Sequence, residues 1–139
     1  MLLSGITVID ITQFISGSRC TQILADMGAE VIKVEPPQGD TLRLIFKLMA
    51  GAERCYSVFN RNKYGIPVNW HDPRGCEVIK KMSEHADIFV HNLVPGSLER
   101  VGLGYKNLTQ LTECLFMDFL DQKTAKWQLL HSHLANGRT

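Results

Sequence analysis

Three short runs of apolar, largely β-branched residues have the length of strands: residues 6–11 (ITVIDI), 31–35 (VIKVE) and 86–91 (ADIFVH). Between the first two runs, residues 19–27 place apolar side chains at helical spacing, and Gly28 is a natural helix stop. Ser18 precedes this segment and is expected to cap the helix through its hydroxyl group. A strand, a helix and a strand within about thirty residues predict a βαβ unit, whose two strands are parallel.

The second half of the chain contains a strong helix start at Asp72, because a capping carboxylate followed by proline favours the first helical turn. We expect this helix to end near His85. Residues 66–70 (IPVNW) precede it and look extended, with a proline that favours an edge position. Two shorter segments are predicted to be weakly helical: residues 42–49 and 97–100.

This alternation of strands and helices predicts an α/β domain of three layers, with a parallel sheet covered on both faces. Ligands of such sheets bind beyond the carboxyl ends of the strands. Three loops are expected at that edge: residues 12–18, 35–40 and 91–96. Function is therefore expected to lie where these loops meet.

Composition limits the classes of function. The chain has 139 residues, which fits one domain, and its formal net charge of +1 gives no bulk attraction to nucleic acid or an anionic membrane. No apolar run approaches the roughly 20 residues of a membrane span, and the N-terminus lacks secretory features, so a cytoplasmic location is expected. The four cysteines form no C-x-x-C pair and are expected to be reduced thiols. No metal site is predicted, since His131 and His133 lack a third ligand.

A dinucleotide is the first ligand to consider, because Glu35 ends the second strand where an acidic residue would meet a ribose hydroxyl. The first loop, residues 15–20 (ISGSRC), has one glycine in place of the G-x-G-x-x-G pattern. NAD binding is therefore not expected, and Glu35 is interpreted as a solvated residue at a strand end.

The ordered motifs LADMGAEVIKVE, NRNK, DPRG, ADIFVHN and GLGY, within residues 3 to about 111, resemble the N-terminal part of family III CoA-transferases. This CaiB/BaiF group includes formyl-CoA:oxalate and carnitine CoA-transferases and is related to α-methylacyl-CoA racemases. The resemblance implies a Rossmann-like domain that binds coenzyme A or acyl-CoA across the ends of the sheet, with a carboxylic acid as the second substrate. The long stretch between Asp40 and Val68 favours the transferases over the racemases.

The same resemblance implies CoA-binding positions. They are Ile15 and Ser16 near the thiol end, Val68, Asn69, Trp70 and His71 along the adenosine, Asn92, Leu93 and Val94 at the pantetheine or phosphate part, and Arg100 on a phosphate. Asn92 also suits an ordinary turn, and Arg100 an exposed helix position. In the NRNK segment, Arg61 and Lys63 could pair with phosphate or equally with a carboxylate elsewhere in the protein.

The chain also departs from the family pattern. Pro36 stands where some relatives carry a CoA-contacting arginine, and Arg43 is the nearest basic residue that could replace it. After residue 111 the resemblance ends, so residues 1–111 are interpreted as the Rossmann-like domain and 112–139 as a divergent tail, in a form truncated relative to the family.

No residue is assigned a catalytic role, because the family's catalytic aspartate, a covalent nucleophile, has no counterpart here. Asp118 and Asp121 match it only in residue type and are expected to face water on a helical tail. The family's interlocked homodimer and second domain are not expected to be complete in this chain. Three functions therefore stay open: a CoA-transferase or a part of one, a non-catalytic CoA-binding or dimerisation module, and a racemase relative.

Overall fold

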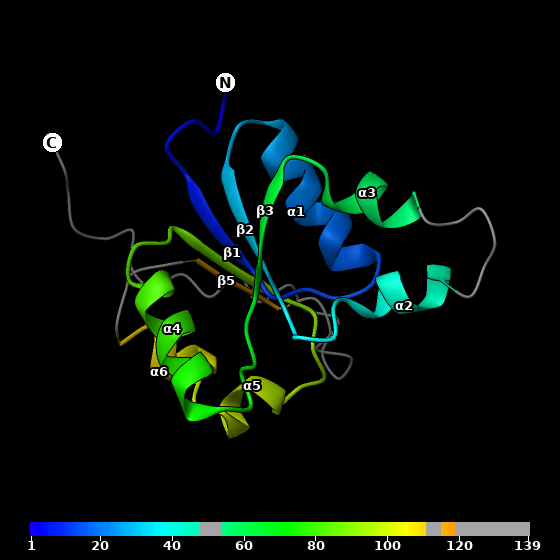
Figure 1. The fold of residues 1–139 in the computed structure, drawn as a ribbon. Helices are drawn as coiled ribbons and strands as arrows, with labels where there is room; N and C mark the ends of the chain where they lie inside the picture. The colour runs from blue at the N-terminus through cyan, green and yellow to red at the C-terminus, as the bar shows by residue number, and fades with distance from the viewer. Residues whose placement is uncertain (48–53, 111–114, 119–139) are drawn as a thin grey trace, which may run out of the picture.

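The computed structural model describes residues 1–47, 54–110 and 115–118, and its centre is a parallel β-sheet (Figure 1). The strands are β1 (Thr7–Asp10), β2 (Glu30–Glu35), β3 (Lys63–Pro67), β4 (Ile88–His91) and β5 (Leu115–Asp118). They lie in the order β3-β2-β1-β4-β5, and every neighbouring pair is parallel. The predicted parallel pairing of the first, second and fourth strands is confirmed.

Helices cover both faces of the sheet, which confirms the prediction of a three-layer α/β domain. The helices on one face are α1 (Ser16–Asp26), α2 (Thr41–Lys47) and α3 (Cys55–Asn60), and those on the other are α4 (Pro73–Ser83), α5 (Ser97–Arg100) and α6 (Tyr105–Leu108) (Figure 1). The short helices α3 and α6 were not predicted from the sequence.

Alternation along the strands divides the core into two clusters. Ile9 of β1 and Phe89 of β4 belong to the cluster that includes Ile79 of α4, and all three are fully buried. Val8, one position before Ile9, belongs instead to the cluster that includes Ala25 of α1. Successive side chains of a strand point to opposite faces, so this sheet is buried on both sides.

Two local predictions about the first helix and the third strand are wrong in detail. Ser18 does not cap α1, because the helix begins two residues earlier at Ser16. Ser18 lies in the first turn of α1 and is fully buried on the inner face of the helix. Strand β3 begins at Lys63 rather than at residue 66 and ends at Pro67. Beyond Pro67 the strand ends, and Val68 and Trp70 turn their side chains into the core.

The helix predicted to start at Asp72 is confirmed. The Asp72 carboxylate accepts a hydrogen bond of 2.9 Å from the backbone N–H of Arg74, and a proline occupies the first turn of α4. This cap satisfies a backbone N–H that would otherwise lack a partner inside the helix. It also fixes the direction in which the chain leaves residues 68–71 and enters α4.

Asp118 does not lie on a helical tail, because residues 115–118 form β5 and pair with β4 in the register His91↔Asp118. Asp121, His131 and His133 lie outside the described residues, and the domain boundary at residue 111 stays a prediction. Within the described ranges, no helix is long and apolar enough to cross a membrane. The cytoplasmic location and the state of assembly also stay predictions.

Candidate functional site

The strand order places a topological switch point between β1 and β4. From β1 the chain continues to β2 on one side, whereas β4 pairs on the other side of β1. In open parallel sheets, ligands bind in the crevice at this point, beyond the carboxyl ends of the strands. The loop after β1 carries Ile15 and leads into α1 at Ser16, and the turn after β4 carries Asn92, so two of the predicted segments lie here.

The side chain of Asn92 joins these two segments. Its Oδ1 accepts a hydrogen bond of 2.7 Å from the backbone N–H of Gln13, and its Nδ2 donates one of 2.6 Å to the Gln13 carbonyl oxygen. Gly17 also lies close, since a Cβ atom added there would be 3.3 Å from Asn92 Cγ and 2.5 Å from Thr12 Cγ2. Asn92 is thus bound within the protein and fixes the loop that carries Ile15 and leads into α1 at Ser16.

Several apolar side chains are exposed on these loops. Phe14, Ile15 and Val94 are 46%, 37% and 68% exposed, whereas Leu93 packs against the core on the α4 side. Phe14 has a φ of 64°, a left-handed conformation that bulky residues rarely adopt. Its N–H donates to Asp40 Oδ1 at 3.2 Å, and this bond helps to hold the strained position.

Residues 68–71 present alternate side chains to solvent. Val68 and Trp70 are 8% and 5% exposed and belong to the core, whereas Asn69 and His71 are exposed. The Trp70 carbonyl oxygen accepts a hydrogen bond of 2.8 Å from the Cys76 thiol, which ties the segment to α4. Val68 and Trp70 therefore anchor the segment, and the exposed side chains available to a ligand are those of Asn69 and His71.

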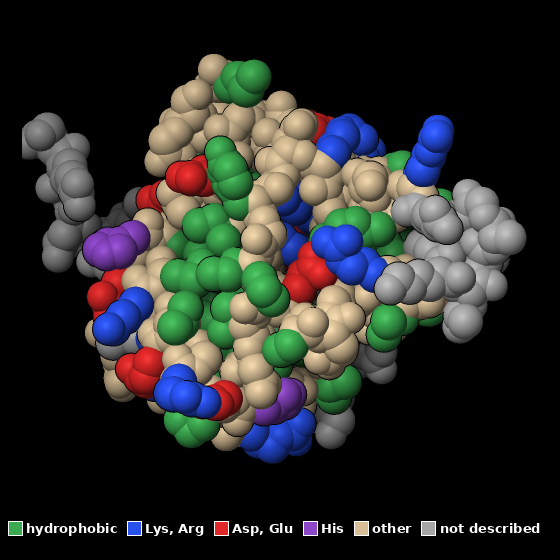
Figure 2. Space-filling view, viewed as in Figure 1, with side chains coloured by type: hydrophobic (Ala, Val, Ile, Leu, Met, Phe, Trp, Pro, Cys, Tyr) green, Lys and Arg blue, Asp and Glu red, His purple; other side chains and the backbone are tan. Residues whose placement is uncertain are grey.

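A hollow of about 310 Å³ brings His71 and Arg100 together from distant parts of the sequence. It is lined by Pro73, Cys76, Glu77 and Lys80 of α4, by His71 before that helix, and by Arg100 and Val101 at the end of α5. On this side of the molecule, apolar side chains gather between β3 and α4, with acidic, basic and histidine side chains around them (Figure 2). Lys80 was not predicted as a site residue.

The NRNK segment contributes to a buried polar cluster under α1 rather than to a free cationic surface. The Lys63 ammonium is 3.0 Å from Asp10 Oδ2 and also donates to Thr21 Oγ1, Asn60 Oδ1 and the Ser18 carbonyl oxygen. Burial lowers the pKa of Lys63, although the Asp10 carboxylate opposes that effect. Of the two pairings left open for Lys63, the structure has the one with a carboxylate of the protein.

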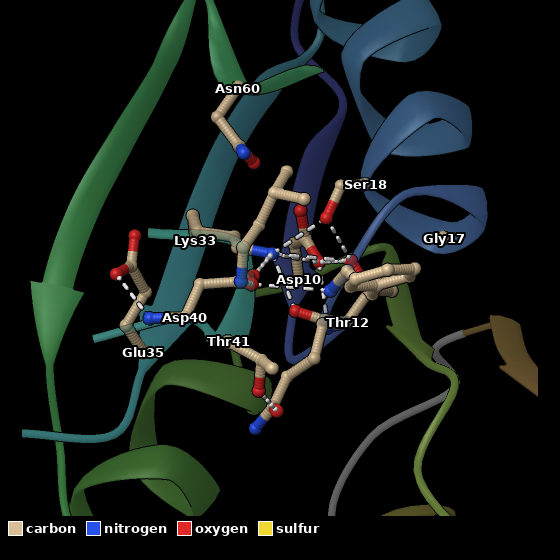
Figure 3. Close-up of polar contacts among 12 residues, drawn as sticks. Asp10, Thr12, Gly17, Ser18, Lys33, Glu35, Asp40, Thr41 and Asn60 are labelled. Carbon is tan, nitrogen blue, oxygen red and sulfur yellow. Dashed lines mark hydrogen bonds and ion pairs between the residues drawn. The ribbon is translucent and has the colours of Figure 1, made fainter. Parts of the chain in front are cut away.

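A second lysine completes the cluster (Figure 3). Lys33 is fully buried beside Asp10 and Asp40, with its Nζ 3.1 Å from Asp40 Oδ2, and it donates to the Thr12 carbonyl oxygen and to Ser18 Oγ. These bonds hold the chain that follows β1. Arg61 is paired as well, since its Nη2 is 2.5 Å from Asp26 Oδ2 on α1.

Glu35 is not a solvated residue, so that interpretation is wrong. It is 7% exposed, and its two carboxylate oxygens accept hydrogen bonds of 2.8 and 3.0 Å from the Arg43 guanidinium. The Tyr56 hydroxyl and the N–H of Asp40 also donate to it, and the guanidinium lies 3.5 Å from the centre of the Tyr56 ring. Arg43 borders a second hollow of about 240 Å³ at the ends of β2 and β3.

This cluster predicts a pH-dependent contribution to stability. Burial alone would raise the pKa of Glu35, but hydrogen bonds from Arg43 and Tyr56 outweigh it and hold the pKa below the ordinary 4.5. The stabilisation is therefore present above pH 4.5 and is lost as the pH falls through the folded-state pKa. Glu35→Gln is expected to lower the free energy of unfolding at pH 7 by about 1–2 kcal/mol.

Urea unfolding between pH 7 and pH 3 tests this expectation. The difference between the parent chain and Glu35→Gln should shrink as the pH falls, whereas the exposed control Glu30→Gln should follow the parent throughout. If the difference in the free energy of unfolding stays constant with pH, ionisation of Glu35 does not stabilise the folded chain.

The described residues contain no group of three or more histidine, cysteine or acidic side chains that could hold a metal ion. Cys20, Cys55 and Cys76 are free thiols, as expected for these three, and burial raises the pKa of Cys20 and Cys76. The candidate site thus consists of the loops at the switch point, with their exposed apolar side chains, residues 68–71, and the hollow lined by His71, Lys80 and Arg100.

Comparison with known proteins gives a consistent result. The model of CoA-transferase family III matches residues 3–116. Human succinyl-CoA:glutarate CoA-transferase is 42% identical over 111 residues, which cover 78% of this chain and 25% of that protein. The (R)-2-hydroxy-4-methylpentanoate CoA-transferase of Clostridioides difficile is 37% identical, with 78% and 28% covered.

Solved structures show the same likeness. A hypothetical protein of Mycobacterium tuberculosis superposes with a TM-score of 0.75 at 31% identity, over 84% of this chain and 32% of that one. A CaiB/BaiF family protein of Brucella suis gives a TM-score of 0.76 at 26% identity, over 83% and 32% of the two chains. The chain thus spans about a quarter of the length of the sequence relatives named above.

Proposed function

Because the chain belongs to CoA-transferase family III, we propose that it binds coenzyme A or acyl-CoA and contributes the CoA-binding part of a transferase that moves CoA between an acyl-CoA and a carboxylic acid. The observation that supports the proposal is one hollow lined by both His71 and Arg100. The family resemblance implies a CoA contact for each of these residues, and they come from separate segments of the chain.

The adenosine end is proposed to lie along residues 68–71. Since the side chains of Val68 and Trp70 are in the core, contact with the ligand would come from backbone groups and from the exposed Asn69 and His71. Arg100 supplies a guanidinium fork to a phosphate at the other wall of the hollow. An adenosine phosphate thus meets a surface already held in place by the Asp72 cap and the Trp70–Cys76 hydrogen bond.

The thiol end is proposed to lie over the loops at the switch point. Ile15 and Val94 are exposed there, and apolar side chains suit the pantetheine arm and its acyl group. Asn92 is proposed to act by position, because its amide is already bonded to Gln13 and holds the Ile15 loop. Ser16, also exposed, begins α1 at this edge.

Covalent catalysis in this family requires an accessible carboxylate as the nucleophile. Three carboxylates at or just beyond the ends of β1 and β2 do not offer one: Asp10 and Asp40 are fully buried against lysines, and Glu35 is bound by Arg43. We therefore propose that the described residues bind and orient CoA, and that none of these three carboxylates is the attacking group.

The second candidate function is a CoA-binding or dimerisation module without turnover, and the bound state of these three carboxylates favours it for the chain alone. A CoA titration by calorimetry beside a CoA-transferase assay with succinyl-CoA and glutarate separates the two. Turnover supports a complete transferase, and binding without turnover supports the module. If the folded chain binds neither CoA nor succinyl-CoA, the proposal is wrong.

The contribution of Arg100 can be measured directly. Arg100→Ala is expected to weaken CoA binding about ten- to hundredfold, the range of one hydrogen bond to a charged group, worth roughly 1.5–3 kcal/mol. Arg100→Lys should recover only part of this affinity, because an ammonium lacks the planar fork. Added salt should weaken the parent chain more than Arg100→Ala.

Lys81→Ala is the matched control, because Lys81 is an exposed cation on α4 that does not line the hollow. It should bind CoA as the parent does. If Arg100→Ala and the parent chain bind CoA with equal affinity, and circular dichroism shows that both are folded, Arg100 does not contact CoA and is an ordinary exposed helix residue.

A further inference from the structure

The hollow that holds His71 and Arg100 contains another cation, Lys80, which lies on α4. Its Nζ is 2.8 Å from Glu77 Oε1, one helical turn before it. The Lys80 side chain is 29% exposed and that of Glu77 is 63% exposed, so more of the Lys80 side chain packs against the protein and Glu77 extends further into solvent.

We infer that Lys80 and Arg100 together recognise a phosphate monoester, which in the proposed ligand is the 3′-phosphate of CoA. The inference rests on the proposed function and adds a specificity-determining residue to it. His71, at the end of the segment proposed for adenosine, lines the same hollow, so the ribose and its phosphate would lie close together.

The charge of the ligand is the physical reason for two cations. A phosphate monoester carries close to two negative charges at neutral pH, since its second pKa is near 6. One guanidinium leaves part of that charge unpaired. The Lys80 ammonium, which neutralises the single exposed carboxylate of Glu77, can turn to the phosphate while Glu77 remains in water.

The diphosphate of CoA offers the same chemistry and could reach the same cations. It leads toward the thiol, however, and the proposed thiol end lies at the loops joined by Asn92 and Gln13. The 3′-phosphate is a separate substituent of the ribose and is not part of the arm that ends in the thiol. A hollow walled by α4 and the end of α5 suits that substituent.

Calorimetric titration with CoA and with 3′-dephospho-CoA distinguishes the two phosphates. Lys80→Gln is expected to weaken CoA binding about fivefold and to leave 3′-dephospho-CoA binding unchanged. Lys80→Arg should keep the preference for CoA. Glu77→Gln should tighten CoA binding about two- to fivefold, because it releases Lys80 from its carboxylate. Lys81→Gln, the neighbouring exposed cation, should change neither ligand.

Three results would overturn the inference. If Lys80→Gln weakens both ligands equally, the ammonium acts on the diphosphate; if it changes neither, the Lys80–Glu77 pair is an ordinary surface pair of the helix. In both cases CoA still binds, and the proposed function stands. If the folded parent chain binds no CoA, the proposed function fails and the inference fails with it.

Discussion

Asp10→Asn is expected to lower the free energy of unfolding by about 3–5 kcal/mol, the cost of removing one partner of a buried ion pair. Asp10 has no exposed surface and lies between two buried lysines, 3.0 Å from Lys63 and 3.9 Å from Lys33. The amide keeps the shape of the side chain but leaves the Lys63 ammonium without its carboxylate. Because domains are stable by only about 5–15 kcal/mol, urea unfolding should show a large shift of the midpoint.

A double-mutant cycle shows whether the pair itself causes the loss. Asp10→Asn combined with Lys63→Met should cost less than the sum of the two single changes, because neither charge is then left buried alone. Glu30→Gln, an exposed carboxylate of β2, should change stability by no more than about 0.5 kcal/mol. Strict additivity of Asp10→Asn and Lys63→Met would show that the two charges do not stabilise each other.

The positions of Asp10 and Lys33 in the sequence indicated that both are buried, but charged residues are not normally assigned to a core. Lysine and aspartate are usually exposed, so the strands were predicted only from their apolar positions. Yet Asp10 and Lys33 stand two residues after Val8 and Val31, and alternation along a strand places each on the same face as that valine. The register pairs Asp10 with Lys33, so a parity argument could have placed both under α1.

Lys63 could not be placed this way. Its position depends on β3 pairing with β2 from Lys63 onward, whereas the proline-containing segment 66–70 suggested a later strand. The short helices α3 and α6 were missed because six and four residues are too few to show a helical period. Long-range pairing and short elements are settled by tertiary contacts, which local patterns do not encode.

The residues of the candidate site also divide into those predicted from the sequence and those that only the structure reveals. Arg100 and His71 were predicted by resemblance, and the structure places both at one hollow, although their roles in binding stay predictions. No sequence pattern pointed to Lys80, because its place at the hollow depends on the tertiary arrangement of α4 and the end of α5. Glu35 was misread because Arg43 and Tyr56, its partners, come from α2 and α3.

Gly75→Ala is expected to lower the free energy of unfolding by about 1–3 kcal/mol through overpacking against the segment proposed for adenosine. A Cβ atom at Gly75 would be 2.0 Å from the Asn69 carbonyl oxygen and 2.8 Å from its carbon, so backbone atoms must move. The usual gain of about 1 kcal/mol for alanine over glycine in a helix is therefore reversed. Urea unfolding measures the loss.

The same displacement should reach the ligand, because Asn69 is followed directly by Trp70 and His71. CoA affinity of Gly75→Ala is expected to fall about tenfold under conditions where the variant is still folded, since small misplacements of a binding segment are costly. Gly65→Ala is the matched control for stability, because a Cβ atom there meets nothing within 4 Å. It should leave the unfolding midpoint unchanged or slightly higher. If Gly75→Ala is as stable as Gly65→Ala, the backbone around Asn69 moves easily and does not hold His71 in place. If Gly75→Ala is less stable but binds CoA as tightly as the parent chain, residues 69–71 do not form the adenosine site.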